Sequence, residues 1–358
     1  MQDALPSSLR CAETAANERV ISVTSERAPG QRRWYVALGA LVAGSLLAGL
    51  VVMLRPTSPV GHWDSDAGRD RYQAAYAAAF AALPEPAETI DVHTDFGIVR
   101  VYRFDGADRG GPPLLLLPGR ASGVPVWADN VPSLLKIGDI YAIDLLGEPG
   151  MSIQSHPITS DAEQAAWLRQ TLDALPEETF HVIGLSIGGW TAVNLALHEP
   201  DVVTTLTLID PALVFDDLPL ETIVRSLPAA LSWLPRSWRD SFTSYTAGGA
   251  PVEDVPVAEM IEAGMQHYRM RLPQPERIPE ERLASLDAPV LAIIAGASVM
   301  HDPRVAAETA QRALANGEVV VIPGASHAVT GEYPDEIAAA ISRFISANQQ
   351  EVPATAQP

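Results

Sequence analysis

A serine flanked by glycines, Gly184-Leu185-Ser186-Ile187-Gly188, constrains the fold of this chain more than any other feature. An apolar run precedes it at residues 180–183, and the stretch 190–198 that follows has the composition of a helix. A strand, a Gly-x-Ser-x-Gly turn and a helix form the arrangement in which a serine hydroxyl becomes a nucleophile. The turn is so tight that the positions two before and two after the serine must lack bulk, which glycine provides. The helix N-terminus behind the serine favours developing negative charge. The pattern therefore predicts that Ser186 is a catalytic nucleophile.

Continuous apolar runs alternate with helix-like segments through most of the chain. A hairpin is predicted around Asp95-Phe96-Gly97, and further strands are predicted at residues 113–117, 139–143, 180–183, 204–209, 290–295 and 318–322. Helices are predicted at residues 66–83, 131–135, 160–175, 191–198, 303–315 and 333–347. Uninterrupted apolar strands that alternate with helices predict an α/β fold, with a mostly parallel central sheet covered by helices on both faces.

The alternation is interrupted once, at about residues 211–288. This stretch contains helix-like pieces rich in Leu, Trp, Met and Pro but no strong strand. We expect a helical cap insertion that lies over the serine, shapes a pocket and excludes water. A helical appendage without a role at the site is the alternative.

Residues 34–54 contain no charged side chain. At about 1.5 Å per residue, a helix of this length spans the hydrocarbon core of a bilayer. Arg32 and Arg33 precede the segment and Arg55 follows it, so positive charge is denser on its N-terminal side. A cleavable signal peptide has a shorter apolar region and a shorter leader. We therefore expect an uncleaved transmembrane anchor in the cell membrane, with a cytoplasmic N-terminus and an extracytoplasmic catalytic domain. A soluble enzyme is the alternative.

These observations divide the chain into five parts. Residues 1–33 form a disordered cytoplasmic tail, 34–54 a transmembrane helix and 55–65 a linker. The catalytic domain occupies residues 66–347, and residues 348–358 form a disordered C-terminal tail.

The composition excludes several classes of function. The net charge is −20 and the pI is about 4.7, which argues against a nucleic-acid partner. The one cysteine, Cys11, cannot form an internal disulfide or a thiolate metal site. The sequence contains neither His-Glu-x-x-His nor Cys-x-x-Cys, so no metal or cofactor is predicted. The sequence does not indicate an oligomeric state.

A serine hydroxyl needs a base that takes its proton. His327 follows the last predicted strand in a loop, where its imidazole can reach the serine, and we predict that it is the base. The base in turn needs an acid that fixes its tautomer. Asp210 directly follows the strand at 204–209, and Asp302 lies after the next strand. We favour Asp210, with Asp302 as the alternative, because an aspartate before Pro303 is expected to cap a helix.

An oxyanion hole requires two backbone N–H groups that point at the tetrahedral intermediate. One is expected from Ile187, the residue after the nucleophile. The other is expected from the loop after the strand at 114–117, where we assign Arg120.

Five motifs together resemble the α/β-hydrolase superfamily, and in particular bacterial carboxylesterase-like members with a helical cap. They are Leu-Leu-Leu-Leu-Pro-Gly at 114–119, Ala-Ile-Asp-Leu-Leu-Gly at 142–147, Gly-Leu-Ser-Ile-Gly-Gly at 184–189, Ile-Asp-Pro-Ala at 209–212 and Pro-Gly-Ala-Ser-His at 323–327. Relatives usually carry an acid three residues after the glycine that ends the strand before the acid loop, but Val299 stands there in this chain. Some superfamily members place the acid one strand earlier, at the position of Asp210.

The resemblance implies a serine hydrolase that works through an acyl-enzyme. With the predicted segment 34–54 we expect it to be membrane-anchored, and the apolar cap favours esters of small or medium apolar acids. Haloperoxidase-like and carbon–carbon bond hydrolase activities share the same triad and remain alternatives. A non-catalytic protein that binds a ligand or partner on the same scaffold is the competing class.

Overall fold

The computed structural model describes residues 44, 58–107, 110–229, 231 and 233–349. The chain divides into two units, Met1–Thr57 and Ser58–Pro358, and the fold described below is that of the second. The predicted tail 1–33 and the predicted transmembrane segment 34–54, except for Gly44, lie outside the described residues. Within the described part of the chain, no helix has the length and apolar character needed to cross a membrane.

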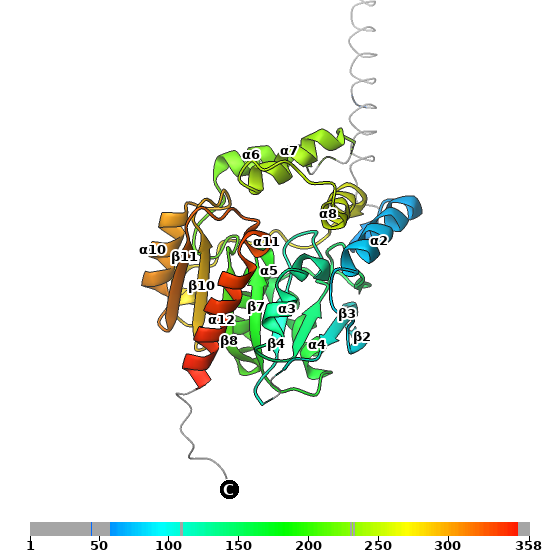
Figure 1. Cartoon of the computed structure of the whole chain (residues 1–358). Helices are drawn as coiled ribbons and strands as arrows, with labels where there is room; N and C mark the ends of the chain where they lie inside the picture. The colour runs from blue at the N-terminus through cyan, green and yellow to red at the C-terminus, as the bar shows by residue number, and fades with distance from the viewer. Residues whose placement is uncertain (1–43, 45–57, 108–109, 230, 232, 350–358) are drawn as a thin grey trace, which may run out of the picture. The chain divides into compact units, whose positions relative to one another are not determined.

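A nine-stranded sheet forms the centre of the second unit (Figure 1). Its main path runs β11-β10-β8-β7-β4-β5-β3-β2, and β6 pairs with β3. The bounds are β2 Glu88–Thr94, β3 Gly97–Phe104, β4 Leu114–Leu117, β5 Ile140–Ile143, β6 Ile153–Gln154, β7 Phe180–Leu185, β8 Val203–Ile209, β10 Val290–Ala295 and β11 Gly317–Ile322. The strands from β11 to β5 pair in parallel, whereas β3 pairs antiparallel with both β5 and β2. The predicted mostly parallel sheet is therefore confirmed, with an antiparallel hairpin at one edge.

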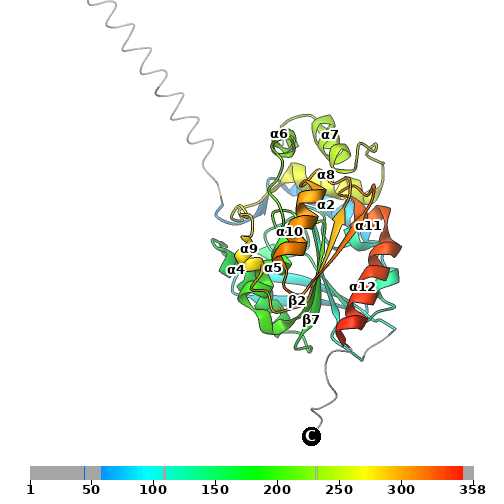
Figure 2. The same ribbon diagram turned by 90° about the vertical axis from the view of Figure 1, so that its left-hand side faces the viewer.

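Helices cover both faces of this sheet, as Figure 2 shows. The helices outside the cap are α2 Asp66–Phe80, α3 Val131–Leu134, α4 Asp161–Asp173, α5 Ile187–His198, α10 Pro303–Ala313, α11 Val329–Glu332 and α12 Pro334–Gln349, with 3-10 turns at Val124–Trp127 and Pro200–Val202. Side chains of α4, α5 and α10 join one hydrophobic core, and those of α2, α3 and α12 join the other. Strand β4 contributes Leu115 and Leu117 to the first core and Leu114 and Leu116 to the second. A strand buried on both faces explains why its sequence is a continuous apolar run.

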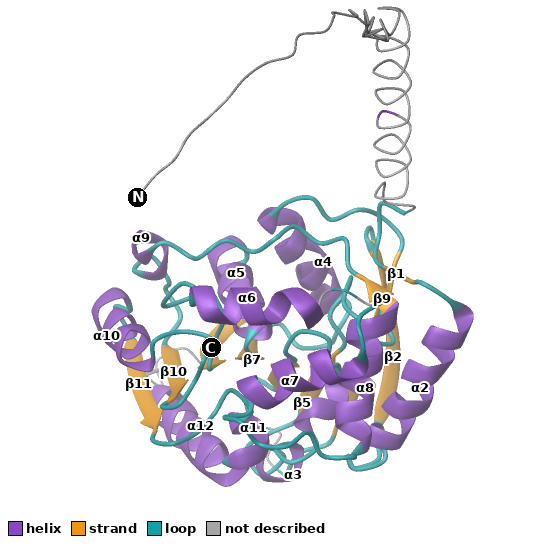
Figure 3. Ribbon diagram, turned by 90° about the horizontal axis from the view of Figure 1, so that it is seen from above, coloured by secondary structure: helices purple, strands orange, loops and turns teal. Residues whose placement is uncertain are grey.

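The segment between β8 and β10 carries helices α6 Leu220–Ala229, α7 Arg236–Thr246, α8 Pro256–His267 and α9 Glu280–Leu283, and the short strand β9 Tyr268–Arg269. Figure 3, the view from above, shows α6, α7 and α8 over the end of the sheet at which β7 meets α5. Helix α8 packs against α2. The predicted helical segment at 211–288 thus lies over the predicted nucleophile.

The expected linker at 55–65 needs correction at its C-terminal end. Strand β1, His62–Trp63, pairs antiparallel with β9, and Gly61 N–H donates to Gln154 Oε1 at 2.8 Å. The Trp63 ring lies 4.9 Å from that of Tyr268, centroid to centroid. Residues 61–63 are therefore part of the folded domain. The sequence did not predict this, because a two-residue strand is too short to produce a periodic signal. At the other end, α12 continues to Gln349, two residues beyond the predicted boundary.

Candidate active site

The turn between β7 and α5 places Ser186 in a strained conformation. Its φ of 53° and ψ of −117° lie outside the regions that an L-residue ordinarily occupies. A Cβ at Gly188 would lie 2.2 Å from the Leu117 carbonyl oxygen, and one at Gly184 would lie 2.3 Å from the carbonyl oxygen of Gly188. Both positions therefore require glycine, and the turn holds the serine hydroxyl at the N-terminal end of α5.

Three of the predicted catalytic side chains meet at this turn. The Ser186 hydroxyl lies 2.9 Å from His327 Nε2, and His327 Nδ1 lies 2.6 Å from Asp210 Oδ2. Asp210 follows β8 and His327 lies in the loop between β11 and α11, so residues far apart in the chain converge at the carboxyl end of the sheet. This is the order nucleophile, base and acid that serine hydrolysis requires.

The alternative acid, Asp302, is placed elsewhere. Its carboxylate Oδ1 accepts hydrogen bonds from the N–H groups of Arg304 and Val305, and its side chain is exposed. It caps the N-terminus of α10, as an aspartate before a proline commonly does. The structure therefore brings Asp210, and not Asp302, to His327.

Asp210 is fully buried and is contacted on both oxygens. Oδ2 also accepts from Ser298 Oγ at 2.6 Å, and Oδ1 accepts from Ala295 N–H at 3.0 Å. Nε2 of the buried His301 lies 3.0 Å from Oδ1. Burial alone would raise the pKa of Asp210, but His301 and His327 outweigh it and hold that pKa below its usual value. The carboxylate is therefore ionised and ready to stabilise a protonated His327.

The loop that carries His327 is held from two sides. Ser326 donates its N–H and its hydroxyl to the carboxylate of Glu332, at 2.7 and 2.6 Å. The N–H of His327 donates to the carbonyl of Thr246, the last residue of α7, at 3.1 Å. The base is thus fixed both by its own neighbourhood and by the helical segment above it.

The two predicted oxyanion donors lie beside the nucleophile. Ile187 is the first residue of α5, where a backbone N–H has no acceptor within the helix. Arg120 follows Gly119, at which a Cβ would lie 3.6 Å from that of Ser186. The loop after β4 therefore passes next to the serine, in the position that a second N–H donor requires.

A buried carboxylate that the sequence reasoning did not single out holds the far end of this loop. Asp144, at the end of β5, accepts from Val124 N–H at 2.7 Å, Met151 N–H at 2.8 Å and the Tyr76 hydroxyl at 2.9 Å. Burial raises the pKa of Asp144, and these donors oppose the rise. Its position after an apolar strand, like that of Asp210, was the available signal.

Glu148 acts in the same way nearer to the predicted donor. Its Oε2 accepts from Ala121 N–H at 3.2 Å, and its Oε1 lies 3.7 Å from Arg120 Nε. Burial raises the pKa of Glu148, against the opposing effect of the Arg120 charge. Ala121 and Gly123 both have φ of 57°, so the loop takes a conformation that must be held in place from outside.

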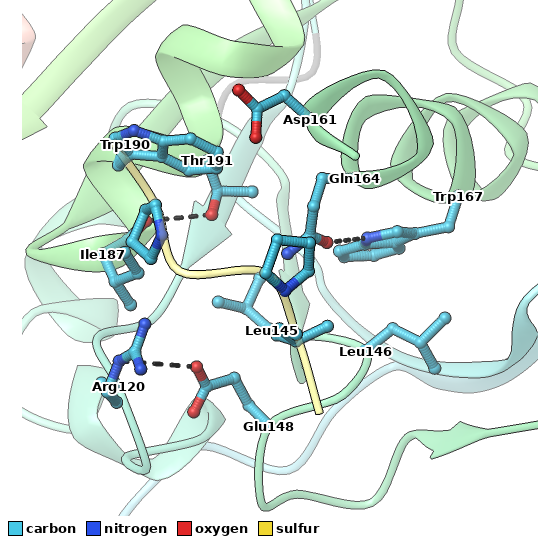
Figure 4. Close-up of a pocket in the computed structure, with 13 residues that line it drawn as sticks. Arg120, Leu145, Leu146, Glu148, Asp161, Gln164, Trp167, Ile187, Trp190 and Thr191 are labelled. Carbon is cyan, nitrogen blue, oxygen red and sulfur yellow. Dashed lines mark hydrogen bonds and ion pairs between the residues drawn. The ribbon is translucent and has the colours of Figure 1, made fainter. Parts of the chain in front are cut away.

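Figure 4 shows the small cavity that begins at Ile187 and Arg120. Its volume is about 20 Å³. The lining residues are Arg120, Leu145, Leu146, Glu148, Asp161, Gln164, Trp167, Ile187, Trp190, Thr191, Leu272, Pro273 and Pro275. The wall is mainly apolar and carries a polar corner, in which Arg120 faces Glu148. Within the described ranges, no group of three or more His, Cys, Asp or Glu side chains is arranged to hold a metal ion.

Comparison with known proteins agrees with this geometry. The chain is 26% identical over 284 residues to a protein of Bacillus subtilis named uncharacterized carboxylesterase nap, covering 77% of this chain and 93% of that one. The crystal structure of naproxen esterase (carboxylesterase NP) from B. subtilis superposes with a TM-score of 0.72 at 25% identity, over 78% of this chain and 99% of that chain. The structure of carboxylesterase CesB (YbfK) from the same organism gives 0.71 at 23% identity, with the same coverage. The model of the alpha/beta hydrolase family matches residues 114–340. The chain therefore belongs to the α/β-hydrolase family.

Proposed function

We propose that this protein is a serine carboxylesterase. The observation that carries the proposal is the continuous hydrogen-bonded array from Ser186 through His327 to Asp210. Similarity over most of the chain to proteins named carboxylesterases supports the same reaction class.

In this proposal each group has a role that fits its position. His327 Nε2 takes the proton of the Ser186 hydroxyl as Oγ attacks the ester carbonyl, and Asp210 stabilises the imidazolium that forms. The N–H groups of Ile187 and Arg120 bind the oxyanion of the tetrahedral intermediate. His327 then gives its proton to the leaving alcohol, and an acyl-enzyme remains on Ser186. Water, activated by the same imidazole, attacks the acyl carbon and releases the acid.

The cavity beside the nucleophile supports apolar acyl groups of small to medium size. Its wall includes Leu145, Ile187, Trp190 and Leu272. A volume of about 20 Å³ holds little more than one water molecule. We infer that the segment carrying Leu272 and the cap above it move outward when a substrate binds, as lids of enclosed active sites do.

An active-site fluorophosphonate probe tests the proposal. It should label the wild-type chain and fail to label Ser186→Ala. A series of p-nitrophenyl esters of graded chain length should then show where the pocket limits the acyl group. Folded protein that takes up no probe would favour a non-catalytic binding role. Labelling without hydrolysis of any ester in the series would point to the haloperoxidase-like or carbon–carbon bond hydrolase alternative.

We also propose that residues 34–54 anchor the enzyme in the cell membrane, with the N-terminus in the cytoplasm and the catalytic domain outside. The support is the uncharged length of this segment and the arginines that precede it. Retention of the chain in carbonate-washed membranes, and digestion of the catalytic domain by protease added to intact spheroplasts, are the expected results. Release of the chain by carbonate would contradict the membrane anchor. Protection of the catalytic domain from protease would indicate the opposite orientation.

A further inference from the structure

Large apolar side chains gather on the outer surface of α6, the turn after it and the start of α7. They are Leu220, Ile223, Val224, Leu227, Leu231, Trp233 and Trp238, and we call them the cap face. Leu220 is 75% exposed and Trp233 is 77% exposed. In the rest of the described chain, only Ile153 and Val321 are large apolar residues with comparable exposure. Single exposed apolar residues are ordinary, but a concentration of this kind marks an interaction surface.

The pattern on α6 is the reverse of that on a normal surface helix. The exposed side chains at 220, 223, 224 and 227 follow the spacing of one helix face, whereas the buried residues of α6 are Thr222 and Ala229. The apolar stripe therefore points away from the domain. A groove of about 430 Å³ lies between α6 and α7, and its lining includes Val224, Pro228, Trp238 and Phe242.

The charges around the cap face do not oppose an anionic surface. Residues 220–246 contain three arginines and two carboxylates, in a chain whose net charge is −20. All three arginines are paired: Arg225 with Glu221, Arg236 with Asp240 and Glu259, and the buried Arg239 with Glu262, so the cap face carries little net charge. Trp233 and Trp238 add the aromatic side chains that favour the headgroup level of a bilayer.

The chain enters the domain on the cap side. The uncharged segment ends at Leu54, so Ser58 follows it by at most about 14 Å of extended chain. Four residues later β1 begins, and it pairs with β9, which directly follows α8 of the cap. The first strand of the described domain thus pairs with the cap segment rather than with the opposite end of the sheet, which supports a bilayer as the partner of the cap.

We propose that the cap face docks into the interfacial layer of the lipid bilayer. This inference rests on the anchoring part of the proposed function. An apolar helix face flanked by tryptophans lies in the plane of the interface, with its side chains in the boundary between headgroups and acyl chains. Docking covers the apolar stripe of α6 and presents the cap to esters dissolved in the membrane.

The full chain, reconstituted in phosphatidylcholine–phosphatidylglycerol vesicles, allows a direct test. A Cys11→Ser background receives one new cysteine, Val224→Cys or Trp233→Cys, which is labelled with an environment-sensitive fluorophore. Ile153→Cys is the matched control, because Ile153 is 61% exposed but lies in β6, outside the cap. Fluorophosphonate labelling of Ser186 shows that each variant is folded.

Cap probes that shift to the blue and are quenched by nitroxide lipids, while the probe at Ile153 is not, support the docking. Equal quenching at both sites in vesicles that retain the protein after carbonate overturns it and leaves the anchor intact. Release of the protein by carbonate, together with quenching of the cap probes, would contradict the transmembrane anchor but support the docking of the cap face. Cap probes shielded from both lipid and aqueous quenchers, in a chain that cross-links as a dimer, would assign the face to a second copy instead.

A second measurement uses hydrolysis. Leu227→Glu combined with Trp233→Glu should lower kcat/KM several-fold toward an ester dissolved in the vesicles and leave kcat/KM unchanged toward a short soluble ester. Ile153→Glu should change neither. Equal losses on both esters would overturn the docking, since they would show a general effect on the site.

Discussion

His301 Nε2 lies 3.0 Å from the carboxylate of Asp210, on the oxygen opposite to the one that contacts His327. One buried aspartate therefore sits between two imidazoles, and only one of them reaches the nucleophile. His301 follows β10, in the loop where relatives usually place the acid itself. In this chain, that loop supplies a histidine and a serine that support an acid located one strand earlier.

The first prediction concerns the choice of acid. Asp210→Asn should lower kcat by about 10³–10⁴-fold, because an amide cannot stabilise the imidazolium and favours the wrong tautomer. Asp302→Asn should retain near wild-type kcat and near wild-type stability, because asparagine caps a helix about as well as aspartate does. Ester hydrolysis and thermal unfolding of the two variants check this. A larger kcat loss in Asp302→Asn would reverse the assignment.

The second prediction concerns the turn at the nucleophile. Gly188→Ala places a methyl group 2.2 Å from the Leu117 carbonyl, so the turn must shift. We expect loss of fluorophosphonate labelling and destabilisation by about 1–3 kcal/mol. Gly331→Ala is the matched control, because its methyl group would lie 3.8 Å from Asp129 Oδ2, its nearest neighbour outside α11. Normal labelling of Gly188→Ala would contradict this prediction, because it would show that the turn accommodates a methyl group at residue 188.

The third prediction concerns the loop that carries the second oxyanion donor. Asp144→Asn removes an acceptor from the N–H of Val124 or of Met151, at a cost of about 1–3 kcal/mol. We expect kcat to fall by about 10²-fold, the cost of one misplaced oxyanion donor, with little change in KM. Asp91→Asn, at an exposed ion pair with Arg100, is the control and should leave kcat unchanged. A change confined to KM would place the loop in substrate binding rather than in transition-state stabilisation.

The fourth prediction concerns stability in acid. His181 is buried in β7, and desolvation lowers its pKa to about 4 from the usual 6.5. Between these two values the unfolded chain binds a proton that the folded chain does not, so stability falls as the pH falls. The expected loss from this residue is about 3 kcal/mol from pH 6.5 to pH 4. In urea unfolding across this pH range, His181→Gln should lose less stability than the wild type. If the free energies of unfolding of the two proteins fall equally with pH, the lowered pKa of His181 is contradicted.

The sequence was sufficient to predict the sheet and the proximity of Ser186 and His327. Strands buried on both faces appear as unbroken apolar runs, such as residues 114–117. The order of these runs along the chain indicates which loops lie at the same end of the sheet. Ser186 and His327 follow from that order, because the carboxyl ends of neighbouring parallel strands share one edge.

The choice between the two aspartates needed the structure. Asp210 and Asp302 both precede a proline and both follow a predicted strand, so local sequence favours a cap at each. The two side chains differ in burial. The Asp210 carboxylate is buried at the carboxyl end of the sheet, whereas the Asp302 carboxylate is exposed and caps α10. The supports at Asp144 and Glu148 were missed for a related reason. A carboxylate that binds backbone N–H groups leaves no spacing pattern, since its partners are set by tertiary packing alone.

The hydrogen bond from His327 N–H to the Thr246 carbonyl joins the loop of the proposed base to the last residue of α7 in the cap. An outward movement of α7 would therefore also displace the loop that holds the His327 imidazole. A slim ester that slips beneath α7 leaves the base in register, whereas a bulky one must lift α7 and disturb it. Selectivity against bulk would then show up in turnover rather than in affinity.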